Sequence, residues 1–516
     1  MYQVRIGRDS FTRVLLGTTA LLLCEIPFAA ATDITIPSGT TETTLQTLTD
    51  PGDTMLIESG GAIDTTLAGT NAANGSADDQ TFINDGTISA GNRGISTVGA
   101  NTAITNNGTI NSPTQAIRAS GANTQITNNG LLDSSVGVFV LGDGFQVTNN
   151  GTIIAADDGI TLSPAANNTR IVNRGSITAR DNAVFIQGLD NSLHNSGTLK
   201  AEGIGGGGDT NHTVEVAAGA DNTRIVNSGK IIRRDFLYDA IHLAGSNSTL
   251  QLLAGSIIVG DVNFVGANPT VKIGTGLNLV LDYEGNAPTI KSDLPHVHDT
   301  ADSVIYTIDP TGLALSQSFI QTMAGAIHDT VQTGMERGNR YGGGFAGNQT
   351  YSYGTGTPGF DDTGPRGWVS GFGGYQTQDG SGAVSGGDQS YGGIVAGGGV
   401  AEEQHVWGVY LGGSYSALES DNDTQEIDAT SVFGGLYGGV EVGGVWVSSS
   451  AMFGYTDFDS DRSVANNTVS SGVETASADY DGWFFSPTLT ATKNLNERTE
   501  MSLGGTYAGL FLSLIH

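Results

Sequence analysis

Histidine and carboxylate side chains are the groups of this sequence that could do chemistry, and they are densest in one short stretch. That stretch contains Asp293, His296, His298, Asp299 and Asp302. Imidazole nitrogens and carboxylate oxygens are ligands that Zn²⁺ accepts, so a metal site is one interpretation. A solvated acidic linker has the same composition, and we favour it. Two further histidines, His194 and His242, lie in strand-like segments and are expected to face solvent.

Adjacent carboxylates are a second candidate, because a pair of Asp or Glu residues can cleave a glycosidic bond. Asp157 and Asp158 are such neighbours. Neighbouring residues of a strand point to opposite faces, so a catalytic pair would need a partner from another part of the chain. The Gly-x-Ser-x-Gly, Gly-Asp-Ser-Gly and His-Glu-x-x-His strings of hydrolases are absent from the sequence. We therefore predict no catalytic, metal-binding or cofactor-binding residues and no enzyme, with a polysaccharide-cleaving enzyme as the alternative.

Composition narrows the partners and the fold. Of 516 residues, 52 are acidic and 21 are basic, and the net charge of -31 disfavours nucleic acid as a partner. A chain of this length is expected to hold two or more folding units. Gly accounts for 77 residues and charged residues for only 14%, a balance that is typical of β-structure with many tight turns.

Residues 1–31 have the order of an export signal peptide. Three arginines precede a short apolar stretch, and small residues follow it. The expected cleavage site comprises Ala29, Ala31 and Thr32. The single cysteine, Cys24, lies inside this segment, so the mature chain would contain no thiol. No later apolar run is long enough for a transmembrane helix, so entry into a membrane would require strands.

A seven-residue phrase recurs about every 22 residues between 82 and 260. "ITNNGTI" (104–110) and "ITNNGLL" (126–132) are two of its copies. Each copy places an Asn two residues before a Gly and apolar residues at positions of the same parity, so these side chains share one face of an extended chain. The Asn residues are Asn84, Asn106, Asn128, Asn149, Asn173, Asn195 and Asn227. A short repeat with a turn and no helical period predicts a right-handed parallel β-solenoid over 32–292.

Stacked coils would place the Asn side chains above one another. We expect a structural ladder in which each buried amide is hydrogen bonded to the next coil. We expect the Gly to supply a turn conformation that other residues resist. Calcium or sugar binding by these Asn residues is the alternative, although calcium coils normally use several Asp carboxylates. The longer step that contains "GIGGGGDTNH" (203–212) is expected to be a loop extruded from one coil.

One segment follows helical spacing. Apolar residues recur mostly every four positions from 313 to 338, which predicts a helix about 39 Å long. Residues 293–312 are expected to connect this helix to the solenoid, and the Gly-rich residues 339–366 to form a flexible linker. The helix is too polar to face lipid, so it requires a path lined by protein. A helix packed on the end of the solenoid is the alternative.

Residues 367–516 alternate large apolar with small or polar side chains, which is the pattern of a lipid-facing barrel. In "VWGVYLGGSYSA" (406–417), for example, Trp407, Val409 and Leu411 share one face. We predict about seven strands. The expected short turns are 401–404, 441–444 and 494–498, and the expected longer acidic outer loops are 377–388, 418–428 and 457–478. A soluble sandwich is the alternative, but it would not require this rhythm of loop lengths.

In this order the segments resemble a monomeric autotransporter of type V secretion. The resemblance rests on the signal, the solenoid, the helix and above all on "GWVSGFGGYQTQDG" (367–380), "SYGGIVAGGGV" (390–400) and "ADYDGWFFSPTLTA" (478–491). It implies an all-β fold in which an antiparallel outer-membrane β-barrel of twelve strands carries a solenoid passenger outward. The helix Leu313–Gly338 would then line the pore. The resemblance also implies outer-membrane lipid and the barrel-assembly machinery as partners.

The end of the chain departs from this family pattern. Seven strands are fewer than twelve, so we expect a partial, C-terminally truncated barrel, and a non-functional frameshifted fragment is one alternative. The favoured interpretation is a protein that is exported through the inner membrane and anchored in the outer membrane. Its passenger would lie at the cell surface and serve non-catalytic adhesion or aggregation, with a host or neighbouring-cell surface ligand as partner.

Overall fold

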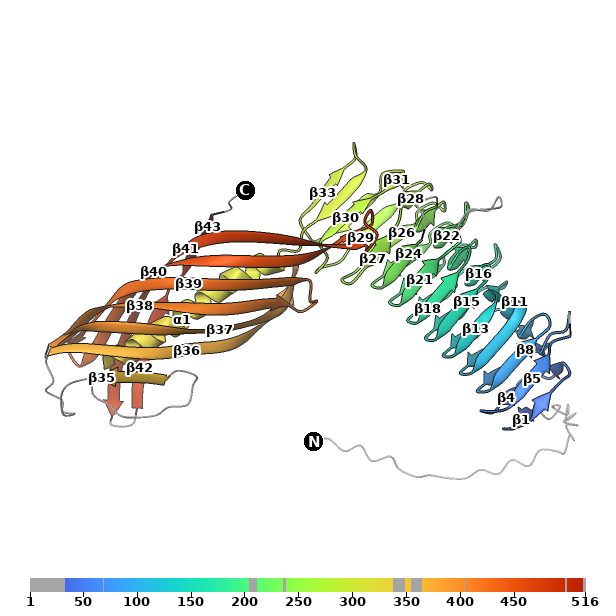
Figure 1. Ribbon diagram of the computed structural model, residues 1–516, viewed down its shortest axis with the longest axis horizontal. Helices are drawn as coiled ribbons and strands as arrows, with labels where there is room; N and C mark the ends of the chain where they lie inside the picture. Colours follow the sequence, from blue (N-terminus) through green and yellow to red (C-terminus); the bar gives the residue numbers. More distant parts are fainter. Residues whose placement is uncertain are drawn as a thin grey trace, which may run out of the picture.

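The computed structural model describes residues 33–67, 69–203, 211–234, 238–336, 349–353, 364–402, 404–496 and 499–513. The expected signal, with its cleavage residues Ala29, Ala31 and Thr32, lies outside the described residues. Figure 1 shows a stack of short strands followed by a group of long strands, with helix α1 (Thr311–Glu336) among the long strands. Within the described part of the chain, no helix has both the length and the apolar character needed to cross a membrane.

The N-terminal part is a parallel β-solenoid with strands on three faces. One face contains, in spatial order, β1 (Ile34–Ile36), β4 (Thr54–Ile57), β7 (Thr81–Asn84), β10 (Ala103–Asn106), β12 (Gln125–Asn128), β14 (Gln146–Asn149), β17 (Arg170–Asn173), β20 (Ser192–Asn195), β23 (Arg224–Asn227), β26 (Thr249–Leu252), β29 (Thr270–Ile273) and β32 (Thr289–Ser292). The other two faces contain β2 (Thr41–Glu42), β3 (Gln46–Leu48), β5 (Ala62–Thr65), β6 (Ala73–Gly75), β8 (Thr87–Ala90), β9 (Ile95–Thr97), β11 (Thr109–Ala119), β13 (Leu131–Val140), β15 (Thr152–Ala155), β16 (Ile160–Leu162), β18 (Ser176–Ala179), β19 (Val184–Ile186), β21 (Thr198–Ala201), β22 (Val214–Val216), β24 (Lys230–Arg233), β25 (Ile241–Leu243), β27 (Ile257–Val259), β28 (Val262–Phe264) and β31 (Glu284–Gly285). The expected parallel solenoid is confirmed.

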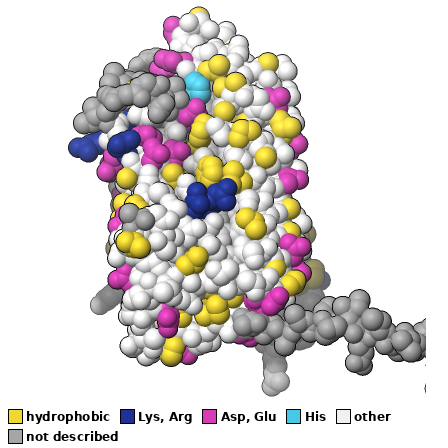
Figure 2. Space-filling model, turned by 90° about the vertical axis from the view of Figure 1, so that its right-hand side faces the viewer, with side chains coloured by type: hydrophobic (Ala, Val, Ile, Leu, Met, Phe, Trp, Pro, Cys, Tyr) yellow, Lys and Arg dark blue, Asp and Glu magenta, His cyan; other side chains and the backbone are white. Residues whose placement is uncertain are grey.

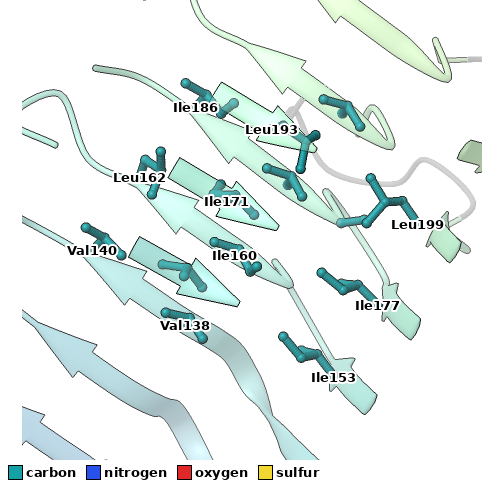
Figure 3. Close-up of a cluster of buried hydrophobic side chains, with 14 of the residues drawn as sticks. Val138, Val140, Ile153, Ile160, Leu162, Ile171, Ile177, Ile186, Leu193 and Leu199 are labelled. Atoms are coloured by element: carbon teal, nitrogen blue, oxygen red, sulfur yellow. The ribbon is translucent and has the colours of Figure 1, made fainter. Parts of the chain in front are cut away.

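The coils stack in register, because equivalent side chains fall at the same place in each turn. Ile104 pairs with Ile126, and Asn106 pairs with Asn128, one coil further along. The inward Ile, Leu and Val side chains form one continuous buried core. Figure 3 shows one such row, Ile153, Ile177 and Leu199. Full burial of one such side chain is worth about 1.5–3 kcal/mol. The neighbouring coils provide this burial, so a coil is stabilised mainly by its two neighbours.

The Gly of each phrase has a different role from the expected one. The expectation that it supplies a turn conformation was wrong, because the left-handed φ angles fall on residues such as Asn101 (54°) and Asn123 (57°). A Cβ at Gly108 would lie only 2.0 Å from the carbonyl oxygen of Gly86 in the coil before it. Gly is therefore needed because stacked backbones approach closely at this position.

Helix α1 begins two residues before the expected start at 313, and residues 337 and 338 lie outside the described residues. The carboxylate of Asp309 explains the early start. Its Oδ1 accepts hydrogen bonds from the backbone N–H of Thr311 (3.0 Å) and from the Thr311 hydroxyl (2.5 Å). Asp309 is thus an N-cap, and Pro310 follows it where a helix does not need an N–H donor.

The expected connector and linker both contain strands. β33 (His296–Asp299) and β34 (Val304–Thr307) form an antiparallel hairpin within 293–312, and β34 also pairs with β30 (Leu279–Asp282). Within the Gly-rich residues 339–366, β35 (Gln349–Tyr353) pairs with β36 (Gly364–Ser381). The described parts of both segments therefore extend the sheet.

The C-terminal strands form an antiparallel sheet in chain order. After β35 and β36 come β37 (Val384–Glu402), β38 (His405–Ser420), β39 (Gln425–Val442), β40 (Val445–Asn466) and β41 (Val473–Asn496), and β41 pairs with both β42 (Thr499–Thr506) and β43 (Gly509–Ser513). The strands are longer than expected. For example, β36 and β37 stay paired as far as Ser381 and Val384, inside the expected loop 377–388. Acidic composition was a poor guide to strand ends, since an antiparallel ladder can continue where both strands extend into water.

The hairpin between β40 and β41 reaches the end of the solenoid (Figure 1). Leu279 of β30 pairs in parallel with Ala465 of β40, and Ala465 belongs to the solenoid core. At the tip, Nδ2 of Asn467 donates to the carbonyl oxygens of Gly260 (3.1 Å) and Asp282 (3.0 Å). Its Oδ1 accepts from the N–H of Asp282 (2.8 Å). The hairpin thus satisfies backbone groups at the open end of the stack.

Candidate functional site

Helix α1 lies within the curve of the antiparallel strands and contacts β36 to β41 (Figure 1). Its buried side chains are spaced mostly by four residues and include Leu315, Phe319, Met323, Ile327, Val331 and Met335. They share one core with inward side chains of the strands. At Gly334 a Cβ would lie 2.8 Å from the ring of Trp368, so the helix and β36 fit closely there. The helix fills the space within the strands and does not pack on the solenoid as the alternative proposed.

Polar side chains of the strands bond to the helix at its start and within this core. Near its start, Oε1 of Gln425 accepts from the N–H of Gly312 (2.6 Å), and Nε2 donates to the carbonyl oxygen of Asp309 (2.9 Å). Further along, His328 is buried with Nε2 at 3.0 Å from Oγ of Ser486. These buried polar groups at the interface of helix and strands are thus paired.

Outward side chains of the same strands are large, apolar and exposed. The exposed fractions are 57% for Trp407, 70% for Leu411 and 64% for Leu436. Along β38 they alternate with inward side chains such as Ser416, which is 1% exposed. A water-soluble protein rarely exposes a continuous apolar surface of this kind, whereas a lipid-facing barrel does.

The structure brings the seven Asn residues of the repeat into one buried column, formed by Asn84, Asn106, Asn128, Asn149, Asn173, Asn195 and Asn227. Nδ2 of each of the first six donates to Oδ1 of the next at 2.7–2.8 Å. Nδ2 also lies near backbone carbonyl oxygens, for example 3.2 Å from that of Thr152 at Asn128. Because the amides bond to one another inside the core, they do not form a surface that calcium or a sugar could reach.

A second row of polar side chains runs beside the column on the outside of the solenoid. Asn107 Nδ2 donates to Asp85 Oδ1 (2.7 Å), and Asn129 Nδ2 donates to Asn107 Oδ1 (2.7 Å). Asn150 continues the row (2.8 Å), and all four side chains are exposed. Our sequence reasoning missed this row, although a second Asn follows the buried Asn in three successive copies of the phrase. Figure 2 shows a face of the molecule on which uncharged surface predominates and charged groups are scattered.

The carboxylates that the sequence singled out are drawn together with a third one from the next coil. Asp157 is hydrogen bonded to Asp181, and Asp181 also accepts from Nε of Arg180 (3.1 Å). Asp158 instead accepts from the backbone N–H of Asn182 (3.1 Å). Glycoside hydrolases separate their two carboxyl groups by about 5–9.5 Å. A directly hydrogen-bonded pair is closer than that and does not fit the catalytic alternative.

Protonation of this pair is shifted by its surroundings. Burial, the hydrogen bond that protonated Asp157 donates to Asp181 and the charge of Asp158 raise the pKa of Asp157 to about 6. For Asp181, burial acts in the opposite direction, but the hydrogen bonds from Arg180 and Asp157 lower its pKa. When the pair binds one proton, below about pH 6, that proton therefore resides mainly on Asp157.

Asp157→Asn is expected to change how stability depends on pH. Because the pKa of Asp157 is raised in the folded state, its contribution to the free energy of unfolding is present below about pH 4 and is lost as the pH rises through about 6. The stability of the variant should therefore fall less than that of the wild type over this interval. Urea unfolding of the full chain in detergent, followed by circular dichroism at several pH values, measures the difference. Ser135→Ala, one coil earlier on the same corner, removes no charge, and an equal pH effect in this control would contradict the assignment.

Two histidines and an aspartate meet at one corner of the solenoid, a group that our sequence reasoning missed. His212 precedes β22, and Asp239 and His242 belong to the next coil at β25. Nδ1 of His242 lies 2.6 Å from Oδ2 of Asp239, and Nδ1 of His212 lies 3.4 Å from the same oxygen. The two imidazole rings stack with centroids 4.2 Å apart. Burial and the neighbouring His242 lower the pKa of His212 to about 4, so this imidazole is neutral at neutral pH.

The other histidines that the sequence singled out lie apart from this group. His298 Nε2 lies 2.8 Å from the hydroxyl of Tyr283, and His296 Nδ1 lies 3.0 Å from the carbonyl oxygen of Leu294. Both belong to strand β33 rather than to a linker. His194 is half-buried on the outer side of β20. Among the residues that the structure describes, His212, Asp239 and His242 are the group whose geometry could hold a metal ion.

Comparison with known proteins locates the similarity in the antiparallel strands. The family model of the autotransporter β-domain matches residues 367–507. This segment begins inside β36 and continues through β42, so it comprises strands that surround α1. No curated protein and no solved structure shows significant similarity to the chain.

Proposed function

We propose that the parallel β-solenoid is a non-catalytic passenger for adhesion or aggregation. The premise is that residues 367–507 are an autotransporter β-domain and follow this solenoid, so that the chain has the organisation of an autotransporter with a β-helical passenger. An autotransporter β-domain implies insertion into the outer membrane with the passenger at the cell surface. The proposal adds what the passenger does there.

Anchoring by the β-domain is supported by the two faces of its strands. Large apolar side chains such as Leu411 and Leu436 point outward, where lipid would cover them. Inward side chains pack on α1. This enclosed helix follows the solenoid in the chain and so connects the passenger to the strands. We propose outer-membrane lipid and the barrel-assembly machinery as the partners of this domain, and export across the inner membrane by the signal at 1–31.

The exposed polar row is the observation that carries the adhesive role. Asp85, Asn107, Asn129 and Asn150 present amide and carboxylate groups at one coil spacing, about 4.8 Å, along the outside of the stack. A regular array of weak hydrogen-bonding groups suits broad contact with another cell surface, because many weak contacts act together. No cavity is needed for contact of this kind.

Expression of the full chain in a Gram-negative host tests the role. Cells that display the protein are expected to settle faster from suspension, or to bind more strongly to a host-cell layer, than cells that express a variant lacking residues 33–292. Asn107→Asp combined with Asn129→Asp should reduce this effect, since the row would then carry three successive carboxylates with Asp85, which repel another acidic surface. Surface amounts are equalised by flow cytometry. If settling and binding match those of the deletion variant, the adhesive role is wrong.

A further inference from the structure

The corner formed by His212, Asp239 and His242 joins two coils of the solenoid. Val214 of β22 pairs with Ile241 of β25, so the registers place His212 directly beside Asp239 of the following coil. One candidate ligand atom from each of the three side chains falls within 4.8 Å of the other two. Imidazole nitrogen and carboxylate oxygen are the ligands that Zn²⁺ takes in three-residue protein sites, where a fourth position is left to water or another ligand.

His212 has an incomplete set of partners. It is only 5% exposed, and its Nδ1 accepts a hydrogen bond from the backbone N–H of Asp239 (3.0 Å). Its Nε2 is buried and has no hydrogen-bond partner among the residues that the structure describes. A buried imidazole nitrogen in this state costs free energy, and such exceptions call for an explanation such as an ion.

We propose that His212, Asp239 and His242 bind one divalent transition-metal ion, for which Zn²⁺ is the best match, and that this ion fastens two successive coils together. Solvent reaches the group through His242, whose side chain is 20% exposed. The positive charge of Arg233 acts on His212 and therefore opposes a bound cation. The Kd is therefore expected to be modest for a metal site, about 1–10 μM.

The position of this corner suggests why a metal ion that links two coils would be useful. His212 lies within the longest step of the repeat, from Gly197 to Gly229, where the chain departs from the spacing of about 22 residues. Stacked coils stabilise one another only through their interfaces, so the interface next to an insertion is a weak point of the solenoid. An ion bound by His212 from one coil and by Asp239 and His242 from the next would hold the two coils together there.

Isothermal titration of Zn²⁺ into full-length, chelator-treated protein in detergent, purified without a histidine tag, tests the proposal. One saturable site is expected, and His242→Asn should weaken binding by about 10-fold or more. His194→Asn, a histidine of a neighbouring coil outside the group, should leave the affinity unchanged. Absence of a saturable site, or equal affinity in the His242→Asn protein, would overturn the proposal.

Co²⁺ absorption provides a readout that does not depend on the folding of a variant. Co²⁺ bound to the wild-type protein by two imidazoles, a carboxylate and one further ligand is expected to show the intense d–d bands of tetrahedral coordination. Weak octahedral bands alone, as in water, would contradict the assigned ligand set. Asp239→Asn serves as the second variant, and its circular dichroism spectrum verifies that the solenoid is folded.

Discussion

Asn128→Ala is expected to lower the free energy of unfolding by about 3 kcal/mol. The substitution removes the oxygen that accepts from Asn106 Nδ2 and the nitrogen that donates to Asn149 Oδ1, both at 2.8 Å. Both neighbours are almost fully buried, so water does not replace the lost hydrogen bonds. The cost combines two unsatisfied buried groups with the hydrogen bonds themselves. Urea unfolding of the full chain, followed by circular dichroism, measures this loss.

Asn129→Ala is the matched control for this prediction. Asn129 is the next residue in the same coil and belongs to the exposed row, where water can hydrogen bond to Asn107 and Asn150 in its place. The expected loss is no more than about 0.5 kcal/mol. Equal losses for the two variants would show that the buried column contributes nothing beyond a surface hydrogen bond.

Asn467→Ala is expected to open the junction between the solenoid and the β-domain. Three hydrogen bonds of this buried side chain would be lost, and the N–H of Asp282 would be left without its acceptor. At about 1 kcal/mol or more for each buried hydrogen bond, local opening should become easier by 2–4 kcal/mol, or about 30- to 1000-fold. Hydrogen exchange at Asp282 and along Leu279–Asp282 should accelerate accordingly.

Thr468→Ala controls for changes in the turn itself. Thr468 is exposed, and its hydroxyl donates only to Asn466 Oδ1 (2.8 Å) in the same turn. Its substitution should leave exchange at Asp282 within a few-fold of the wild type. If Asn467→Ala leaves the protection of Asp282 intact as well, the hairpin does not hold the end of the solenoid.

Periodic features of this protein could be read from the sequence, because stacking turns a fixed spacing into a fixed position. The parity of Ile104 and Asn106 relative to Gly108 was enough to predict a parallel solenoid, which is confirmed. The hydrogen bonds between successive Asn side chains have the geometry that this spacing predicts. Alternation along 406–417 similarly separated the outward Trp407 from the inward Ser416.

Features without a period could not be read in the same way. His212 aligns with Asp239 only after the insertion before it is set aside, so the two appear unrelated in the sequence. Asn467 contacts Asp282 across 185 residues, and no local pattern indicates such a pairing. The role of Gly108 depends on a contact with the preceding coil rather than on its own φ angle, so the general preference of Gly for turns pointed to the wrong cause.

Display of the solenoid outside the outer membrane is tested most directly by cysteine labelling. The chain has one natural cysteine, Cys24, inside the expected signal, so an introduced cysteine is a unique site in the mature protein. Asn129→Cys in the exposed row is expected to react with a membrane-impermeant maleimide on intact cells. Ser414→Cys, which points inward to Met323, should not react. Labelling of Asn129→Cys only after the outer membrane has been permeabilised would contradict the account.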